Sequence, residues 1–237
     1  MTWLPQPPGS WRATHRDEMF ERWAAELVKH DERVRGLDVE VHFDEGVTHV
    51  TGSVDSPGQL DELRNLLGRL DGVLAVWDRV QVAGRPPPVV LDLGCGETKQ
   101  YDDNIGVDRR ATMATALLAD VSQPLPFAPG SIDAVFAVHV LEHLVDFLPL
   151  VDECHRVLRP GGVLHVLSPW WRHVNAVADP THVRFLDVQT IKGICARAGS
   201  DRFWQPLHAG CDGATVFADL TPAVAEPDPA QLARFFD

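Results

Sequence analysis

The pattern of hydrophobic and polar positions changes once along the chain, near residue 85. Before that point, helical spacing and strand-like alternation follow one another in the order helix, strand, strand, helix, strand. The expected elements are a helix over residues 14–34, a hairpin of strands 37–43 and 47–54 joined at Glu45-Gly46, a helix with leucines over 60–70, and a strand over 73–82. This order predicts a small α+β domain over residues 1–84.

After the boundary, short apolar runs alternate with helical segments. Gly84-Arg85-Pro86-Pro87-Pro88 separates the two parts, because consecutive prolines form a stiff, exposed linker. The expected strands cover residues 89–93, 104–107, 116–119, 132–138 and 163–167, with helices near 142–158 and 187–199. Such alternation predicts an α/β domain with a mostly parallel sheet over residues 85–237.

Composition narrows the classes of protein that fit this pattern. The chain has 237 residues, 45% of them hydrophobic, and a formal charge of 21 − 34 = −13. This acidic balance disfavours a general affinity for nucleic acid. No apolar stretch approaches the roughly 18 residues of a membrane span, and the four cysteines include no Cys-x-x-Cys pair. We therefore expect reduced cysteines and a cytoplasmic protein.

A glycine turn follows the first strand of the second domain. Residues 89–93 are typical of a strand covered on both faces, and Gly94 and Gly96 let the backbone turn sharply where a ligand approaches. Asp108 follows the next strand, where a carboxylate can accept hydrogen bonds from both hydroxyls of a ribose. Asp120-Val121 follows the third strand, where the carboxylate and a backbone N–H can hold an adenine.

Six motifs in order along this domain resemble those of the Rossmann-like, class I methyltransferases, which use S-adenosylmethionine (SAM). The matching stretches are Leu91-Asp92-Leu93-Gly94-Cys95-Gly96, Gly106-Val107-Asp108, Ala119-Asp120-Val121 with Leu125-Pro126-Phe127, Ser131-Ile132-Asp133-Ala134-Val135, His139-Val140-Leu141-Glu142-His143 and Leu158-Arg159-Pro160-Gly161-Gly162. The resemblance covers roughly residues 88–220. It implies a Rossmann-like, mostly parallel seven-stranded sheet and SAM as the cofactor.

The resemblance also implies roles for single residues. Asp92, Gly94 and Gly96 would line the methionine end of SAM, and His139 would lie near the sulfonium. The cofactor-binding residues expected in all are Asp92, Gly94, Cys95, Gly96, Asp108, Arg109, Asp120, Val121 and His139.

The segment after the glycine turn distinguishes SAM from a dinucleotide. A pyrophosphate favours Gly-x-Gly-x-x-Gly, whereas Glu97 to Asp103 contains no third glycine and several acids. An NAD-dependent oxidoreductase is therefore the weaker alternative, and Tyr101 is the only tyrosine that a Lys/Tyr pair could use. Residues 97–103 leave room for two helical turns at most, where the family usually has a full helix. A subgroup with this short connection often acts near sugar or polysaccharide chemistry.

The long connection after residue 168 is expected to act as a lid over the substrate. Methyl transfer needs positioning, plus a base where the accepting atom carries a proton; His182 is the first candidate for that base and His139 the second.

No metal is expected, because no third ligand lies beside His139 and His143 in the sequence. Two adjacent tryptophans should point to opposite sides. The substrate-binding candidates are Trp170, Trp171, His173, Asp179 and Arg184.

These expectations combine into a two-domain SAM-dependent methyltransferase that acts on an oxygen or nitrogen atom of a small molecule, sugar-related or a secondary metabolite. The alternative from another class is a regulatory protein that binds SAM without turnover. Residues 14–83 resemble a BON domain, mainly through Gly72-Val73-Leu74-Ala75-Val76. That domain is a candidate for homo-oligomer contacts.

Overall fold

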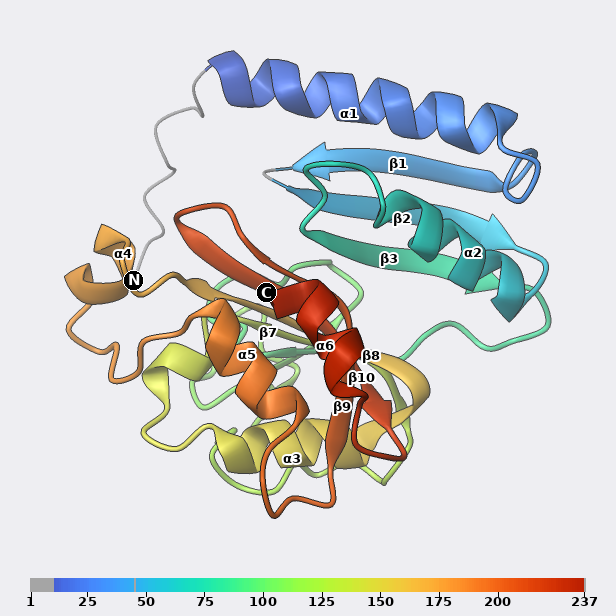
Figure 1. The fold of residues 1–237 in the computed structure, drawn as a ribbon. Coiled ribbons are helices and arrows are strands. Elements are labelled where there is room, and N and C mark those ends of the chain that lie inside the picture. Colours follow the sequence, from blue (N-terminus) through green and yellow to red (C-terminus); the bar gives the residue numbers. More distant parts are fainter. Residues whose placement is uncertain (1–10, 45, 237) are drawn as a thin grey trace. The chain divides into compact units, whose positions relative to one another are not determined.

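The computed structural model describes residues 11–44 and 46–236, with the side chains of residues 11–16 left out (Figure 1). Glu45 of the expected hairpin turn lies outside the described residues. The chain divides into two compact units, Met1–Pro87 and Pro88–Asp237. Each unit has its own hydrophobic core, so each is described by itself.

The first unit contains a three-stranded sheet in the order β1-β2-β3. β1 and β2 form the expected antiparallel hairpin, while β2 and β3 are parallel and joined through α2. Phe20 of α1 stacks on Phe43 of β1 with ring centroids 5.2 Å apart, which anchors the helix to the sheet. Its elements are α1 (Trp11–His30), β1 (Asp38–Asp44), β2 (Val47–Val54), α2 (Pro57–Leu67) and β3 (Ala75–Val82), in the predicted order.

α2 begins where the sequence predicts. Oγ of Ser56 accepts a hydrogen bond from the N–H of Gln59, and Oε1 of Gln59 accepts one from the N–H of Ser56. Pro57 occupies the first turn. The helix buries its expected leucine face, formed by Leu60, Leu63, Leu66 and Leu67.

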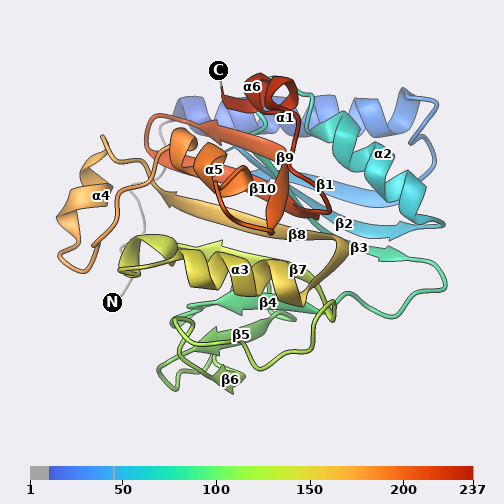
Figure 2. The ribbon, with the colours of Figure 1, turned by 60° about the horizontal axis from the view of Figure 1, so that its bottom comes forward.

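The second unit contains a seven-stranded sheet in the order β6-β5-β4-β7-β8-β10-β9 (Figure 2). β10 alone runs against its neighbours, which confirms the predicted mostly parallel, seven-stranded sheet. α3 packs on β8, and α5 and α6 pack on β9. The elements are β4 (Val90–Leu93), β5 (Ile105–Asp108), β6 (Leu117–Leu118), β7 (Ile132–Val138), a 3-10 helix η1 (Leu141–His143), α3 (Leu148–Val157), β8 (Leu158–Pro169), α4 (Val174–Ala178), α5 (Val188–Cys195), β9 (Phe203–Cys211), β10 (Thr215–Ala223) and α6 (Pro229–Phe236).

The structure departs from the expected elements at the start of β8 and before α3. β8 begins at Leu158 rather than at residue 163, because Pro160-Gly161-Gly162 forms an irregularity within the strand instead of a turn before it. The expected helix near 142–158 is broken into η1 and α3, and Pro149 lies in the first turn of α3, where proline suits a helix start.

A buried cluster of one carboxylate and two histidines joins strands β8, β9 and β10. Asp219 of β10 accepts hydrogen bonds from Nδ1 of His165 (2.7 Å) and Nδ1 of His208 (2.9 Å). Burial alone would raise the pKa of Asp219, but its interactions with the two histidines outweigh burial and hold that pKa well below the usual range.

Among the described residues, no helix is both long enough and apolar enough to cross a membrane.

Candidate cofactor site and lid

The expected site residues follow the ends of parallel strands at one edge of the second sheet. β4 pairs with β5 on one side and with β7 on the other, so the strand order reverses between β4 and β7. A doubly wound sheet binds its ligand at such a reversal, beyond the carboxyl ends of the strands. The segments after β4, β5, β7 and β8 therefore form the candidate site.

The glycine turn after β4 depends on two left-handed residues. Gly94 and Gly96 have φ angles of +61° and +56°, in the region that favours glycine. The N–H of Gly94 donates to the carbonyl of Val107 at 2.7 Å, which ties the turn to β5. A Cβ on Gly94 would lie 2.9 Å from Cγ2 of Val140, so conformation and space both require glycine there.

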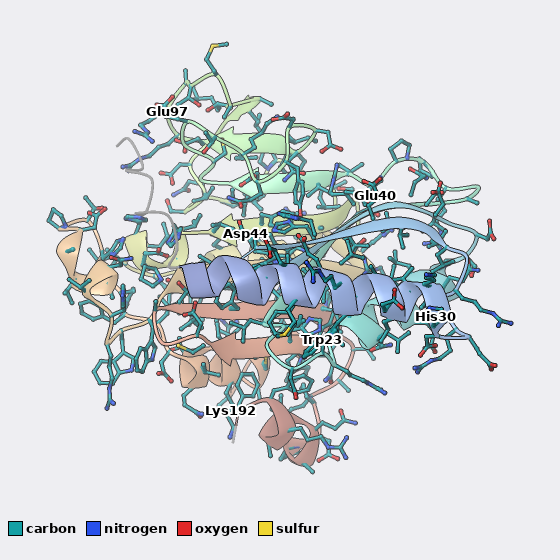
Figure 3. All side chains as sticks on the ribbon, turned by 90° about the horizontal axis from the view of Figure 1, so that it is seen from above. Trp23, His30, Glu40, Asp44, Glu97 and Lys192 are labelled. Atoms are coloured by element: carbon teal, nitrogen blue, oxygen red, sulfur yellow. The ribbon has the colours of Figure 1, made fainter. Side chains whose placement is uncertain are left out.

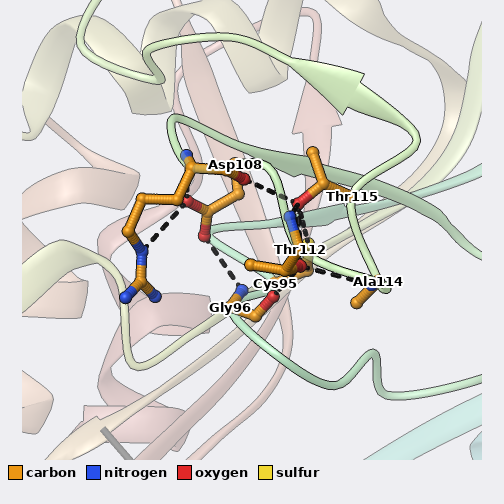
Figure 4. Close-up of polar contacts among 7 residues, drawn as sticks. Cys95, Gly96, Asp108, Thr112, Ala114 and Thr115 are labelled. Carbon is orange, nitrogen blue, oxygen red and sulfur yellow. Dashed lines mark hydrogen bonds and ion pairs between the residues drawn. The ribbon is translucent and has the colours of Figure 1, made fainter.

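Asp108 lies beside this turn at the end of β5 and is only 6% exposed. Its Oδ2 accepts from the N–H of Gly96 at 2.9 Å and its Oδ1 from the N–H of Arg110 at 2.8 Å (Figure 4). A carboxylate offers about four lone-pair positions, so each oxygen keeps one for a further donor. The two free lone-pair positions of this carboxylate can therefore accept hydrogen bonds from two neighbouring hydroxyl groups.

Two threonines that the sequence analysis missed support the turn. Thr112 donates through Oγ1 to the carbonyl of Gly96, and Oγ1 of Thr115 lies 4.0 Å from Sγ of Cys95 (Figure 4). Burial raises the pKa of the Cys95 thiol, so this cysteine packs against the loop in its neutral form. No spacing rule indicates these threonines, because the loop that contains them is placed by tertiary contacts.

Asp92 holds the segment after the glycine turn. Its buried carboxylate accepts from the N–H of Gln100 and from Nδ2 of Asn104 at 3.4 Å. Burial raises the pKa of Asp92, and the two hydrogen bonds act in the opposite direction. Lys99 donates to the carbonyl of Asn104 at 3.0 Å, and residues 97–103 contain no helix. The full helix that the resembling family usually has here is thus replaced by a loop folded onto Asp92.

Asp120 and Arg109 follow β6 and β5, which are neighbours in the sheet. Asp120 is exposed and accepts from the N–H of Ser122 at 2.9 Å. That bond, with a contribution from the positive charge of Arg109, lowers the pKa of Asp120. Val121 is half-buried against the core. The acid, the cation and the apolar side chain therefore lie at the same sheet edge as Asp108.

His139 has an unusual backbone at the end of β7. Its φ is +54°, and it is the sole non-glycine residue with positive φ among the described residues. Its Nδ1 lies 3.1 Å from Oε1 of Glu142, which is 1% exposed, and Oε2 of Glu142 accepts from Ser168 at 3.0 Å. Strained backbone of this kind is concentrated at functional sites. Glu142 and Ser168 were not among the expected site residues.

The prediction that Trp170 and Trp171 point to opposite sides was wrong. The indole N–H groups of Trp170 and Trp171 both donate to Oδ2 of Asp187, at 3.0 and 3.1 Å, so both turn to the same side. The alternation of a strand does not apply to them, because β8 ends at Pro169. The guanidinium of Arg172 lies 4.7 Å from the ring centroid of Trp171, a cation–π distance.

The rest of the lid segment, defined as residues 170–185, contains the other candidates. His173 caps α4, and Arg184 donates through Nε to the carbonyl of Val145 at 2.7 Å. Asp179 accepts from the N–H and the hydroxyl of Thr181, which lowers its pKa. The side chain of His182 is 7% exposed, and its Nδ1 lies 3.1 Å from the carbonyl of Ala176. The lid segment also exposes apolar side chains: Trp171, Val174, Val177, Val183 and Phe185.

Part of the chain is similar to known methyltransferases. Residues 91–166 match the family described as methyltransferase domain. A probable S-adenosylmethionine-dependent methyltransferase of Mycolicibacterium smegmatis is 32% identical over 172 residues, which cover 63% of this chain and 64% of that protein. Another of Mycobacterium tuberculosis is 28% identical over 176 residues, with 61% and 64% covered. The chain thus spans 64% of the length of these relatives.

A solved SAM-dependent methyltransferase from Archaeoglobus fulgidus is similar to this chain with a TM-score of 0.42 and 16% identity, covering 57% of this chain and 86% of that one. The family match spans β4 to β8, and the glycine turn, Asp108 and His139 all fall within it. The candidate site after β4, β5 and β7 thus lies in the segment that is similar to the methyltransferase domain family.

Proposed function

We propose that the chain transfers the methyl group of SAM to an oxygen or nitrogen atom of a small molecule. The observation that carries this proposal is the position of Asp108 and His139 at the carboxyl ends of β5 and β7, the two strands that flank β4 and its glycine turn. Asp108 has two free acceptor positions for the ribose hydroxyls, and His139 follows the strand next to the glycine turn. Asp92, Gly94, Cys95, Gly96, Arg109, Asp120 and Val121 complete the proposed cofactor site.

His139, rather than His182, is our first candidate for the group that takes the proton of the acceptor. Nδ1 of His139 meets the buried carboxylate of Glu142, and the side chain is 42% exposed. A carboxylate that holds Nδ1–H leaves Nε2 as the acceptor, the arrangement used in general-base catalysis. His182 is less accessible, since only 7% of its side chain is exposed.

The lid segment supports an acceptor with an apolar or aromatic part. Its exposed side chains include Trp171, Val177 and Phe185, which offer contact area to such a molecule. His173, Asp179 and Arg184 would bind its polar groups together with Trp170. The formal charge of −13 disfavours nucleic acid as the acceptor. All four cysteines are free thiols, which fits the cytoplasm that we propose as the location.

The first unit keeps the role proposed from the sequence. Its mixed sheet, with α2 crossing between the parallel strands β2 and β3, is an α+β arrangement that fits a BON-like module. We propose that this module contacts a second copy of the chain. Removal of the first unit should then reduce the mass of the particle in solution to that of a monomer.

Replacing His139 by asparagine should lower turnover by about 100-fold or more, the usual loss when a proton acceptor is removed. Asparagine tolerates the positive φ of this position, so the backbone of the site is kept while the imidazole is lost. The measurement is production of S-adenosylhomocysteine (SAH) from SAM with a panel of sugar-related and aromatic alcohols and amines.

The matched control for this experiment is His30→Ala, which removes an exposed histidine of α1 (Figure 3) that also has a carboxylate partner. The control should turn over normally, and His139→Asn should bind SAH as the unchanged chain does. Normal turnover in His139→Asn would remove this residue from the mechanism. Binding of SAH with no turnover on any acceptor would favour a regulatory protein instead.

A further inference from the structure

The structure brings together three side chains that could bind one metal ion. Glu142 and His143 belong to η1, after β7, and His182 belongs to the lid segment, after β8. One ligand atom from each lies within 4.8 Å of the other two. The rings of His143 and His182 meet edge to face, with centroids 4.7 Å apart. A metal was not expected from the sequence, because the third ligand comes from a distant part of the chain.

Hydrogen bonds fix which nitrogen of each histidine is free. Nδ1 of His182 lies 3.1 Å from the carbonyl oxygen of Ala176, and a carbonyl can only accept, so this nitrogen carries a proton. Nδ1 of His143 lies 3.3 Å from the carbonyl and 3.0 Å from Oγ1 of Thr181. The Thr181 hydroxyl gives its own hydrogen to Asp179, so it accepts from His143. Both histidines therefore present Nε2 as the ligand atom, and Nε2 of His182 also lies 4.0 Å from Oδ2 of Asp179.

This arrangement is the one that metal-binding histidines use. A histidine ligand almost always donates its second N–H to a carbonyl or carboxylate, which fixes its orientation and tautomer. The carboxylate of Glu142 is held in a similar way, because Oε2 accepts from Ser168 at 3.0 Å. Each of the three candidate ligands thus has a protein partner that orients it.

Backbone hydrogen bonds hold the lid segment beside η1. The N–H groups of Val183 and Arg184 both donate to the carbonyl of Glu142, at 2.8 and 3.0 Å. Arg184 adds its side-chain bond to Val145, beyond η1. His182 is therefore held beside η1 by hydrogen bonds on the residues that follow it.

From these contacts we propose that Glu142, His143 and His182 bind a divalent transition-metal ion, with zinc as the preferred ion. Two imidazoles and one carboxylate suit zinc, and three protein ligands leave a fourth position open. Ligand atoms of a tetrahedral zinc lie roughly 3.3 Å apart when each is about 2.0 Å from the metal. The three ligand atoms lie within 4.8 Å of one another, so they would have to move closer together when the ion binds.

The fourth, open coordination position would let the ion bind and activate the methyl acceptor. A hydroxyl oxygen of the acceptor bound there would lose its proton more readily, because the metal stabilises the alkoxide. His139 contacts one of the three candidate ligands, because its Nδ1 lies 3.1 Å from Oε1 of Glu142. This use of the ion rests on the proposed methyl transfer, whereas binding of the ion does not.

The test is a titration of the full chain, stripped of metal with a chelator, with Co²⁺ and then with Zn²⁺ in the absence of SAM. We expect one equivalent of Co²⁺ to bind with the visible absorption of a low-coordinate site, and Zn²⁺ to displace it. His143→Ala and His182→Ala should each weaken binding by at least about 100-fold, since loss of an orienting partner alone costs 10- to 100-fold.

His30→Ala serves as the control, because it removes a histidine that faces Glu26 at 3.1 Å outside the proposed site. Circular dichroism and a thermal melt without ligand report whether each variant is folded; His143 is exposed, so at least the His143→Ala variant should stay folded. Absence of the Co²⁺ band in the unchanged chain, or equal bands in folded His143→Ala and the control, would overturn the proposal. Because no SAM is used, this failure is separate from a failure of methyl transfer.

Discussion

Asp108→Ala should lower the affinity for SAH by at least about 100-fold. The carboxylate has two acceptor positions left after its bonds to Gly96 and Arg110, and we assign them to the ribose hydroxyls. A hydrogen bond to a charged group contributes about 1.5–3 kcal/mol, and each 1.4 kcal/mol changes the affinity about tenfold. Loss of two such bonds therefore predicts a fall of this size or larger, measured by isothermal titration calorimetry.

The control for this variant is Asp102→Ala. Asp102 is an exposed acid of the loop after the glycine turn, so the control removes the same charge close by without touching the proposed cofactor contacts. It should bind SAH within about threefold of the unchanged chain. Asp108→Asn keeps the shape of the side chain and removes its charge, and it should lie between the two. Unchanged affinity in Asp108→Ala would place the ribose elsewhere.

Gly106→Ala should destabilise the second unit by about 3 kcal/mol, at the upper end of what overpacking usually costs. A Cβ on Gly106 would lie 2.1 Å from the carbonyl oxygen of Ala114 and 2.9 Å from Sγ of Cys95. The first of these atoms belongs to the backbone, so the loop after β5 must move as a whole. SAH affinity should fall as well, because Cys95 belongs to the glycine turn.

Gly193→Ala is the matched control, since Gly193 lies in α5 and a Cβ there would meet nothing within 4 Å. Alanine is preferred over glycine in a helix by about 1 kcal/mol, so this control should melt at an equal or higher temperature. The melting transition that SAH raises reports the second unit in both variants. A Gly106→Ala variant as stable as Gly193→Ala would show that the strand end is not tightly packed.

The cofactor site could be predicted because its residues follow strand ends in a fixed order. Gly94, Asp108 and Asp120 are each placed by a short local pattern of apolar strand and polar turn, and the structure brings them to one sheet edge. Their roles toward SAM stay predictions that the variants above test. The bonds that support them, such as that from Thr112 to Gly96, join loops whose path depends on the folded sheet.

The lid could not be predicted in the same way. His182 reaches His143 only because Val183 and Arg184 bind the carbonyl of Glu142, a contact between distant parts of the sequence. The tryptophan pair was placed wrongly because the end of β8 was not known. The antiparallel strands β9 and β10 were implied by the resemblance rather than by alternation, since Pro206 and Gly210 interrupt the pattern of β9.

The central claim is that the glycine turn and Asp108 bind SAM and not a dinucleotide. The most direct measurement is a thermal-shift comparison of the full chain with SAM, SAH, NAD and NADP at equal concentrations. We predict that SAM and SAH raise the melting temperature of the second unit, because a ligand that binds the folded state alone stabilises it. We predict no shift with NAD or NADP. A shift with either dinucleotide, or none with SAM and SAH, would contradict the claim.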